Sequence, residues 1–447
     1  MTKKFFSQSE KYNPNYACRV IKIENIRKHE KADRLEIIST MGYDVIVRTD
    51  SFHIGDFAIY CPVESQLNAQ FLKINNQFED AELNDDNKIK GFFNKRGRVR
   101  AVKLRELPSE GFIFPYQWLS NWKSDMNIGN IEDFVDIDFD TVNGELFSKK
   151  YIVYVKEKSV GSTKSNKRNK VLKRFDRLVE NQWNFHIDTE QLRRNIYKLD
   201  PDDMVQISVK KHGTSACIGK VLVNRKLTWK DKVAKFCGVK VMEQEYDGVY
   251  SSRTVIKNRY INQNVSTGYY ETDVWGKANE ILQPHLAEGM TIYCELCGYL
   301  PGSNSMIQKG YDYGCEVGEF RIIIYRITMT TPNGYVHEFS TQWVKYWCKT
   351  HGLDPVQELY YGKLKDLYPD LEISEHWHEN LLQRLSTEEK WYMEMNDPNC
   401  LNKVPFEGIV IRKETLGINV FKLKCFAFLG MECKANDNNE INIEDTN

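Results

Sequence analysis

The sequence predicts an α+β protein in which a small N-terminal β-barrel precedes a larger domain of mixed strands and helices. Three observations lead to this fold class. The chain has 447 residues, which at ~100–200 residues per domain is enough for two or three domains. Between residues 17 and 119, short β-branched or aromatic runs recur at the spacing typical of a small all-β domain. From Phe185 onward, such runs alternate with helical patterns, which indicates a mixed α+β domain.

The composition is that of a folded chain without membrane spans. Hydrophobic residues make up 41% and charged residues 28%, which excludes collagen, coiled-coil and wholly disordered classes. No apolar run approaches the ~20 residues that span a bilayer, and the first residues lack the apolar core of a signal peptide. We therefore expect an intracellular protein, with the cytoplasm favoured over the nucleus, reduced cysteines and no membrane partner. The 62 basic and 62 acidic residues balance, so affinity for a polyanion must come from local charge.

The N-terminal strands resemble an OB fold. The segments KHEKADRLEII, GDFAIYCPV and RGRVRAVKLRELPSEGFIFP are similar to the OB-fold domain at the front of some RNA ligases. OB barrels bind single strands and irregular nucleic acids through basic grooves with stacking aromatics. An alternating run of positive side chains would supply such a groove, with a merely solvated strand face as the alternative. The predicted nucleic-acid-binding residues are Arg96, Arg98, Arg100, Lys103 and Arg105.

These patterns divide the chain into four segments. Residues 1–125 are the OB-like nucleic-acid-binding domain, 126–182 a polar basic linker, 183–432 the larger domain and 433–447 an acidic tail. Within the linker, residues 156–177 hold nine Lys or Arg against two acids, a composition that cannot bury a core. We expect this stretch to be exposed and either to contact phosphate or to act as a solubilising tether.

A lysine before a glycine is the first candidate for covalent chemistry. Apolar and polar residues alternate up to Val209, which predicts a strand with one buried face. Side chains repeat every two residues along a strand, so Lys210 and His212 share one side and Lys211 takes the other. Gly213 then lets the backbone turn closely around a ligand. Lys210 is therefore the preferred nucleophile and Lys211 its rival.

Carboxylates and a pair of lysines follow in chain order. The segment YCELCG places Glu295 in a strand, and FEGIVIRKE places Glu407 ahead of a β-branched run. Lys422 and Lys424 are two residues apart, so they share one strand face and can clamp a phosphate. Arg253, upstream of all four, can recognise a planar anion. This order of residue types describes a covalent nucleotidyltransferase.

Six short motifs in this order resemble motifs I, Ia, III, IIIa, IV and V of the covalent nucleotidyltransferase superfamily. That superfamily contains ATP-dependent RNA ligases, DNA ligases and mRNA capping enzymes. The histidine of motif I, the phrase ELCGYLPGSNSMIQKGYDYG and the preceding OB-like domain together resemble the Deinococcus-type RNA ligases. The resemblance implies a nucleotidyltransferase (adenylation) domain with antiparallel sheets and flanking helices. The motifs are K-x-H-G from Lys210, S-R from Ser252, E-L-x-G from Glu295, Y-R-I from Tyr325, E-G-I-V-I-R from Glu407 and F-K-L-K from Phe421.

The resemblance implies a role for each matching residue. Lys210 would attack the α-phosphate of ATP and hold AMP through a phosphoramidate bond, while Lys422 and Lys424 would bind that phosphate. Glu407 would help hold Mg²⁺ or Mn²⁺ through water. Glu295 would accept hydrogen bonds from the ribose.

The remaining matches concern the base, the phosphates and the turn. Tyr325 would stack on adenine, and Arg253 would contact a phosphate or ribose of the nucleotide or RNA. His212 replaces the Asp of many ligases, so its role stays open between phosphate contact and pocket structure. The predicted nucleotide-binding residues are Val209, Lys210, His212, Gly213, Arg253, Glu295, Tyr325, Glu407, Lys422 and Lys424.

Other patterns have simpler explanations. Cys294 and Cys297 form a C-x-x-C, but no second pair exists and zinc is not expected. His376 and His378 lie in a helical stretch and are interpreted as surface or core histidines. The basic insertion at residues 225–240 is either an RNA-facing flap or a helix packed on the sheet.

We therefore expect an ATP-dependent RNA ligase that joins a 3′-hydroxyl to a 5′-phosphate through lysyl-AMP and an RNA-adenylate. Nicks in duplexes that contain RNA are the expected substrates. A DNA ligase or a GTP-using capping enzyme of the same superfamily is one alternative, which nucleotide preference and strand-swapped nicks would separate. A non-catalytic RNA-binding protein is the other, and the intact catalytic residue types count against it. No protein partner can be inferred.

Overall fold

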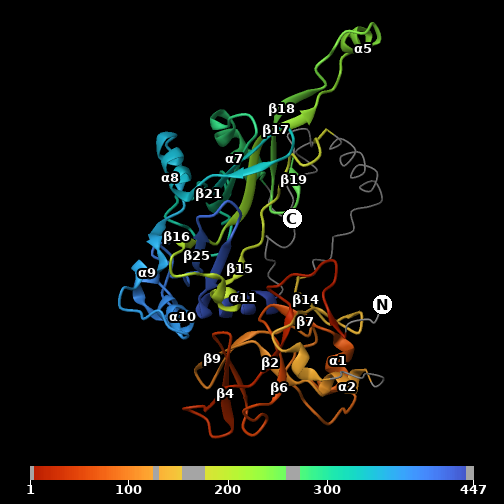
Figure 1. The fold of residues 1–447 in the computed structure, drawn as a ribbon, viewed down its shortest axis with the longest axis vertical. Coiled ribbons are helices and arrows are strands. Elements are labelled where there is room, and N and C mark those ends of the chain that lie inside the picture. The colour runs from red at the N-terminus through yellow and green to blue at the C-terminus, as the bar shows by residue number, and fades with distance from the viewer. Residues whose placement is uncertain (1–4, 124–129, 154–176, 258–271, 439–447) are drawn as a thin grey trace.

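The computed structural model describes residues 5–123, 130–153, 177–257 and 272–438. Figure 1 shows an N-terminal body of short strands and short helices, and a C-terminal body of larger sheets with helices around them. Helix α11 (Phe426–Asp437), the last element of the described chain, lies where the two bodies meet.

The N-terminal body is built from short antiparallel strands. One sheet has the order β10 (Phe112–Pro115), β6 (Phe57–Cys61), β2 (Cys18–Lys22) and β11 (Asp138–Phe139). A second sheet consists of β3 (Ile26–Lys28), β4 (Leu35–Thr40) and β5 (Tyr43–Arg48). Strand β5 contacts β9 (Leu107–Glu110), which forms a hairpin with β8 (Ala101–Leu104). Helices α1 (Ala69–Ile74) and α2 (Trp118–Trp122) close one side of the body.

This body extends beyond the predicted boundary at residue 125. Strand β11 pairs with β2, and β14 (Ser148–Lys150) pairs with β7 (Ser65–Leu67). Strands β1 (Phe6–Ser7), β12 (Thr141–Val142) and β13 (Glu145–Leu146) form a third small sheet. Residues 130–153 belong here and not to a linker, because Phe139, Val142 and Phe147 complete the buried core. The basic stretch of the predicted linker, residues 156–177, lies outside the described residues except for Arg177.

Two antiparallel-rich sheets form the C-terminal body. The five-stranded sheet has the order β15 (Glu190–Gln191), β26 (Val420–Lys424), β25 (Gly408–Lys413), β16 (Met204–Lys210) and β24 (Glu358–Lys363). The larger sheet has the order β19 (Ile256–Lys257), β18 (Gln244–Ser251), β17 (Thr214–Asn224), β20 (Met290–Gly298), β21 (Phe320–Thr330) and β22 (Val336–Glu338), with β23 (Asp354–Pro355) beside β21. A core of buried side chains lies against each sheet.

Helices cover these sheets through apolar faces. Helices α7 (Val274–Leu282) and α8 (Thr341–Thr350) contribute to the core of the larger sheet. Helix α10 (Trp377–Thr387) covers the five-stranded sheet, together with the short helices α4 (Leu192–Asn195) and α9 (Leu364–Leu367). The alternation of strands with helices that the sequence predicts beyond Phe185 is thus confirmed. His376 precedes α10 and pairs with Glu379, and His378 contacts the Leu199 carbonyl, so both have ordinary structural partners.

Helix α11 joins the two bodies and corrects the interpretation of the N-terminal arginines. Its residues Phe426, Leu429 and Cys433 form a small core with Ala101 of β8. Arg98 is buried and donates hydrogen bonds to the Cys433 carbonyl at 2.7 Å and to Asp437 Oδ1 at 3.0 Å.

The neighbouring basic residues lie in the same region. Arg96 donates to the Asn436 carbonyl and to the Tyr151 hydroxyl, and Arg100 donates to Glu79. Lys103 lies 5.7 Å from the ring centroid of Phe426. Lys103 and Arg105, the latter in the β8–β9 turn, are both exposed. The predicted nucleic-acid-binding strand is therefore largely an interdomain strand, and the predicted tail at 433 begins inside a packed helix.

None of the helices in the described part of the chain is long and apolar enough to cross a bilayer. All eleven cysteines are free thiols. Cys294 and Cys297 are both buried in β20, and within the described ranges no group of three potential ligands could hold a metal ion.

Candidate active site

Strand register places three lysines on one face of the five-stranded sheet. Lys210, the last residue of β16, is paired with Gly408 of β25, and Gly408 is paired with Lys424 of β26. Lys422 lies two residues before Lys424, in the cross-strand row that also holds Ser208. Residues directly opposite one another, and residues two apart, share a face. The three ammonium groups therefore enter the same space.

Glu407 lies beside the first of these lysines. Lys210 Nζ is 2.7 Å from Glu407 Oε1, and the Glu407 side chain is only 3% exposed. The next residue, Gly408, has φ +146° and an added Cβ would lie 2.0 Å from the Leu423 carbonyl oxygen, so glycine is required where these strands meet. Glu407 Oε2 has no hydrogen-bond partner among the described residues. A buried carboxylate oxygen without a partner is costly, and an incoming polar ligand would relieve that cost.

The paired lysines are electrostatically unequal. Burial, together with the ammonium groups of Lys424 and Lys210, lowers the pKa of Lys422 to about 8. Burial would also lower the pKa of Lys424, but the Glu432 carboxylate, 2.7 Å away on α11, raises it well above its usual range. The site therefore holds one buried cation with a nearby carboxylate partner and one whose charge is poorly compensated. An anion such as a phosphate would stabilise the charged form of Lys422.

The opposing wall comes from the larger sheet. Ser215 of β17 is paired with Glu295 of β20, and both side chains line the same cavity. The Tyr325 hydroxyl lies 3.0 Å from His186 Nδ1 and 3.5 Å from Ser215 Oγ. Burial raises the pKa of Tyr325 well above its usual range, so its phenol stays neutral. This wall offers an aromatic ring and a carboxylate opposite the lysines.

The motif I turn requires glycine. Glu295 Oε1 accepts a hydrogen bond from the Gly213 amide at 3.1 Å, and an added Cβ at Gly213 would lie 2.3 Å from the Leu296 carbonyl oxygen. The ring of His212 packs edge-on against Tyr311 and Phe428, with centroid distances of 4.8 and 4.9 Å. This packing favours the pocket-structure alternative for His212 over phosphate contact.

Arg253 forms an ion pair with Asp188 at the edge of the cavity. Burial would raise the pKa of Asp188, but Arg253 lowers it to about 2, so the carboxylate stays ionised. The guanidinium thus already binds an anion of the chain itself. A phosphate contact by Arg253 would have to share or displace Asp188.

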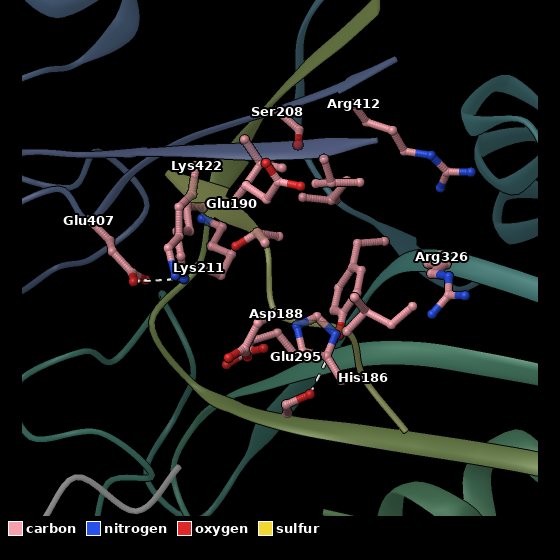
Figure 2. Close-up of a pocket in the computed structure, with 18 of the residues that line it drawn as sticks. His186, Asp188, Glu190, Ser208, Lys211, Glu295, Arg326, Glu407, Arg412 and Lys422 are labelled. Atoms are coloured by element: carbon pink, nitrogen blue, oxygen red, sulfur yellow. Dashed lines mark hydrogen bonds and ion pairs between the residues drawn. The ribbon is translucent and has the colours of Figure 1, made fainter. Parts of the chain in front are cut away.

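These walls enclose a cavity of about 220 Å³. Figure 2 shows Glu407 and Lys422 on one side, with His186, Asp188 and Glu295 opposite. The N-terminal body also reaches the cavity, through Tyr16, Glu64 and Lys150. Glu64 has a left-handed backbone at φ 67°, which is unusual for a non-glycine residue. Its carboxylate lies near Lys422 and Lys424.

The two rival lysines have different surroundings. Lys210 contacts Glu407, whereas Lys211 Nζ lies 4.6 Å from the centroid of the Tyr313 ring. Burial lowers the pKa of Lys211, and Asp397 opposes that shift. Val209 also lines the cavity, although its side chain belongs to the core of the five-stranded sheet.

Sequence reasoning missed several cavity residues. His186, Asp188 and Glu190 line the cavity ahead of β16, and their spacing of two residues was a signal that could have found them. Glu432 lies eight residues beyond Lys424, inside α11, and Glu64 comes from the other body. Neither has a local pattern that points to the site.

Two parts of the chain match known protein families. Residues 203–424 match the RNA ligase family, and residues 18–116 match an OB-fold domain family. The larger domain of the chain belongs to the RNA ligase family. The N-terminal body is accordingly an OB-fold domain, and this RNA ligase carries it ahead of the catalytic domain. None of the curated protein sequences compared with the chain matches it.

Solved structures of Naegleria gruberi RNA ligase share the fold of this RNA ligase across both domains. The apo form of an aspartate-to-alanine mutant is 13% identical with a TM-score of 0.53, over 93% of this chain and 98% of that chain. A lysine-to-alanine mutant with ATP and Mn is 14% identical with a TM-score of 0.54, over 93% and 98%. The complex with PPi is 13% identical with a TM-score of 0.54, over 93% and 98%. This likeness confirms the predicted fold class.

Proposed function

We propose that this RNA ligase uses ATP to load AMP onto Lys210 and then seals a 3′-hydroxyl to a 5′-phosphate at nicks in duplexes that contain RNA. One observation carries the proposal. The Lys210 amine lies 2.7 Å from buried Glu407, on the sheet face that also presents Lys422 and Lys424 to the cavity. A nucleophile, an acidic neighbour and a two-cation clamp are the parts that nucleotidyl transfer requires.

In the first step, the neutral Lys210 amine attacks the α-phosphorus of ATP. A P–N bond forms, the P–O bond to pyrophosphate breaks, and the amine loses a proton. Lys422 and Lys424 bind the α-phosphate and offset the charge that develops on its oxygens. Tyr325 and Glu295, on the opposing wall, take the adenine ring and the ribose.

Glu407 is the residue that would hold a divalent cation. Its buried Oε2 lacks a partner within the described residues, which fits a metal-bound water as hydrogen-bond donor. Mg²⁺ or Mn²⁺ bound there would supply positive charge beside the amine and the α-phosphate. A single carboxylate suits Mg²⁺, because that ion keeps most of its water ligands.

The next steps move AMP to RNA. An oxygen of the RNA 5′-phosphate attacks the lysyl-AMP phosphorus, so the P–N bond breaks and an RNA-adenylate forms. The 3′-hydroxyl then attacks the 5′-phosphate, which closes the phosphodiester and releases AMP. Naegleria gruberi RNA ligase, which shares this fold, has been studied with ATP and Mn, with AMP and Mn, and with PPi, which supports ATP as the source of the AMP.

Transfer of label from α-labelled ATP to the protein tests the proposal. Wild type and Lys211→Ala should both become labelled, and Lys210→Ala should not. GTP in place of ATP should give no label, which separates a ligase from a capping enzyme. Sealing should then occur at nicks with RNA on the 3′-hydroxyl side and fall at all-DNA nicks. Label on Lys210→Ala but not on Lys211→Ala would reject the assignment.

A further inference from the structure

A helical arm projects from the larger sheet and is not used by the mechanism above. Strands β17 and β18 pair in continuous register from Cys217–Ser251 to Asn224–Gln244, and residues 225–243 connect their outer ends. This connection contains α5 (Trp229–Phe236). Figure 1 shows α5 at the tip of the hairpin, away from the rest of the molecule.

The arm is a defined structure although its helix buries none of its residues. Thr228 and Asp231 form a complete capping box at the start of α5, with hydrogen bonds of 2.8 and 3.2 Å. Arg225 pairs with Asp231 at 3.0 Å, and Lys235 pairs with Glu243 at 2.7 Å, which ties the helix to its own base. The arm is therefore preorganised without tertiary packing.

Its apolar side chains are exposed on one side. Helix α5 buries none of its residues. Trp229 is 72% exposed, Val233 52% and Phe236 93%, and their spacing of four and three residues places them on one helix face. Exposed aromatics in such a cluster mark a binding surface.

The charge of the arm identifies the kind of partner. Residues 225–243 contain six basic and two acidic residues, in a chain whose net charge is zero. Both acids are already paired with Arg225 and Lys235. Four lysines thus remain without an acidic partner within the described part of the chain, and two of them flank the aromatic face on either side. They are Lys226, Lys230, Lys232 and Lys240.

We propose that this arm binds unpaired nucleotides of the RNA substrate, with bases stacked on Trp229 and Phe236 and phosphates on the surrounding lysines. Stacking aromatics interleaved with cations are what single-stranded nucleic acid needs, because every base offers a π-face.

Strand β17 connects the arm to the active site. Ser215 near the start of this strand lines the catalytic cavity, and the far end of the strand carries the arm. From Ser215 to Asn224, the last residue of β17, the strand spans roughly 30 Å, which is close to one turn of an A-form duplex. The substrate would therefore carry a loop or single-stranded extension about one turn from the break. This inference rests on the proposed function.

Binding of labelled RNA to the full chain tests it. Two nicked duplexes are compared by fluorescence anisotropy, one fully paired and one with a single-stranded extension one turn from the nick. The double variant Trp229→Ala/Phe236→Ala should bind the extended duplex more weakly, by at least about fivefold per stacked base. Its affinity for the fully paired duplex should be unchanged. Tyr335→Ala/Tyr346→Ala is the matched control, because these exposed aromatics lie elsewhere. Replacing all four lysines with Gln should make the association constant for RNA less dependent on salt. The slope of its logarithm against the logarithm of salt concentration should fall in magnitude by up to about 0.7 per lost single-strand phosphate contact.

Two further readouts keep the proposal falsifiable. A variant in which Asn-Gly replaces residues 225–243 closes the β17–β18 hairpin directly, and should lose the preference for the extended duplex. Labelling with ATP and sealing of the paired nick should survive in every arm variant, so a failure of the proposed function would be seen separately. Equal affinities of wild type for both duplexes would overturn the proposal. Unchanged RNA binding by the Trp229→Ala/Phe236→Ala variant would also overturn it. If that variant instead lost a dimer in sedimentation, or lost binding to anionic vesicles, the arm would be a protein or membrane contact.

Discussion

Lys422 is an ammonium group held in the protein interior at a cost in stability. It is 8% exposed, and its pKa of about 8 lies below the ordinary 10.5. The folded state therefore binds the proton of this residue less tightly than the unfolded state does. Such costs are typical of sites built to receive a charged substrate.

Replacing Lys422 with Met should stabilise the protein while abolishing labelling by ATP. At pH 7 we expect the free energy of unfolding to rise by up to about 3 kcal/mol. Between pH 8 and 10.5 the unfolded chain holds this proton and the folded wild type does not, so wild-type stability recovers and the advantage of the variant shrinks. Urea denaturation at pH 7 and pH 10 measures this. Exposed Lys403→Met should change stability by less than about 0.5 kcal/mol.

A loss of stability in Lys422→Met at pH 7 would contradict the account. It would mean that the carboxylates around the site, among them Asp188 and Glu64, stabilise the charged lysine by more than burial costs it. The pH dependence separates the two cases, because a net stabilising lysine would give an effect of opposite sign.

At the scale of the element, the β25–β26 hairpin positions the chemistry through one glycine. Gly408 precedes the β-branched run of β25, is paired with both Lys210 and Lys424, and follows Glu407. Its left-handed φ and the nearby Leu423 carbonyl leave no room for a side chain. A shift of the backbone at Gly408 would therefore move Glu407 together with Lys210 and Lys424.

Gly408→Ala should therefore reduce labelling by ATP strongly and lower stability by about 1–3 kcal/mol. Gly417→Ala on the same hairpin is the matched control, because no atom lies within 4 Å of the added Cβ. Thermal unfolding and initial labelling rates report the two effects. Equal behaviour of the two variants would show that Gly408 is not a spatial requirement.

The limits of sequence prediction follow element by element. The strand containing Lys210 and the pair formed by Lys422 and Lys424 were predictable, because strand periodicity fixes which side chains share a face. Glu432 was not, since its contact with Lys424 depends on how α11 packs after the strand ends. The arginines around Arg98 were predicted to bind nucleic acid. Alternation of side chains along a strand shows which residues share a face, but it does not show which part of the protein covers that face.

The OB-fold domain and the catalytic domain form a continuous unit around α11. Arg98 is 1% exposed and satisfies the Cys433 carbonyl and Asp437 at the helix end. Tyr16, Glu64 and Lys150 of the first domain line the catalytic cavity. Contacts between residues so far apart in the sequence cannot be predicted from local patterns. This explains why the predicted domain boundary at residue 125 lies before Lys150, the end of the last strand of this domain.

Arg98→Ala should loosen this docking. Because it removes the donor to the buried Cys433 carbonyl and a partner of the exposed Asp437 carboxylate, we expect a loss of about 1–3 kcal/mol and a separate early unfolding transition for one domain. Differential scanning calorimetry resolves such transitions. Arg27→Ala removes an exposed ion pair with Asp44 in the same domain and should cost less than about 1 kcal/mol. A single unshifted transition in Arg98→Ala would contradict a role in docking.

The central claim is that Lys210 carries AMP during catalysis. Wild-type protein incubated with ATP and Mg²⁺, digested at neutral or alkaline pH and examined by tandem mass spectrometry, tests it most directly. The account predicts one acid-labile AMP adduct, located on Lys210, which pyrophosphate removes. An adduct on Lys211 or on any other side chain would contradict it.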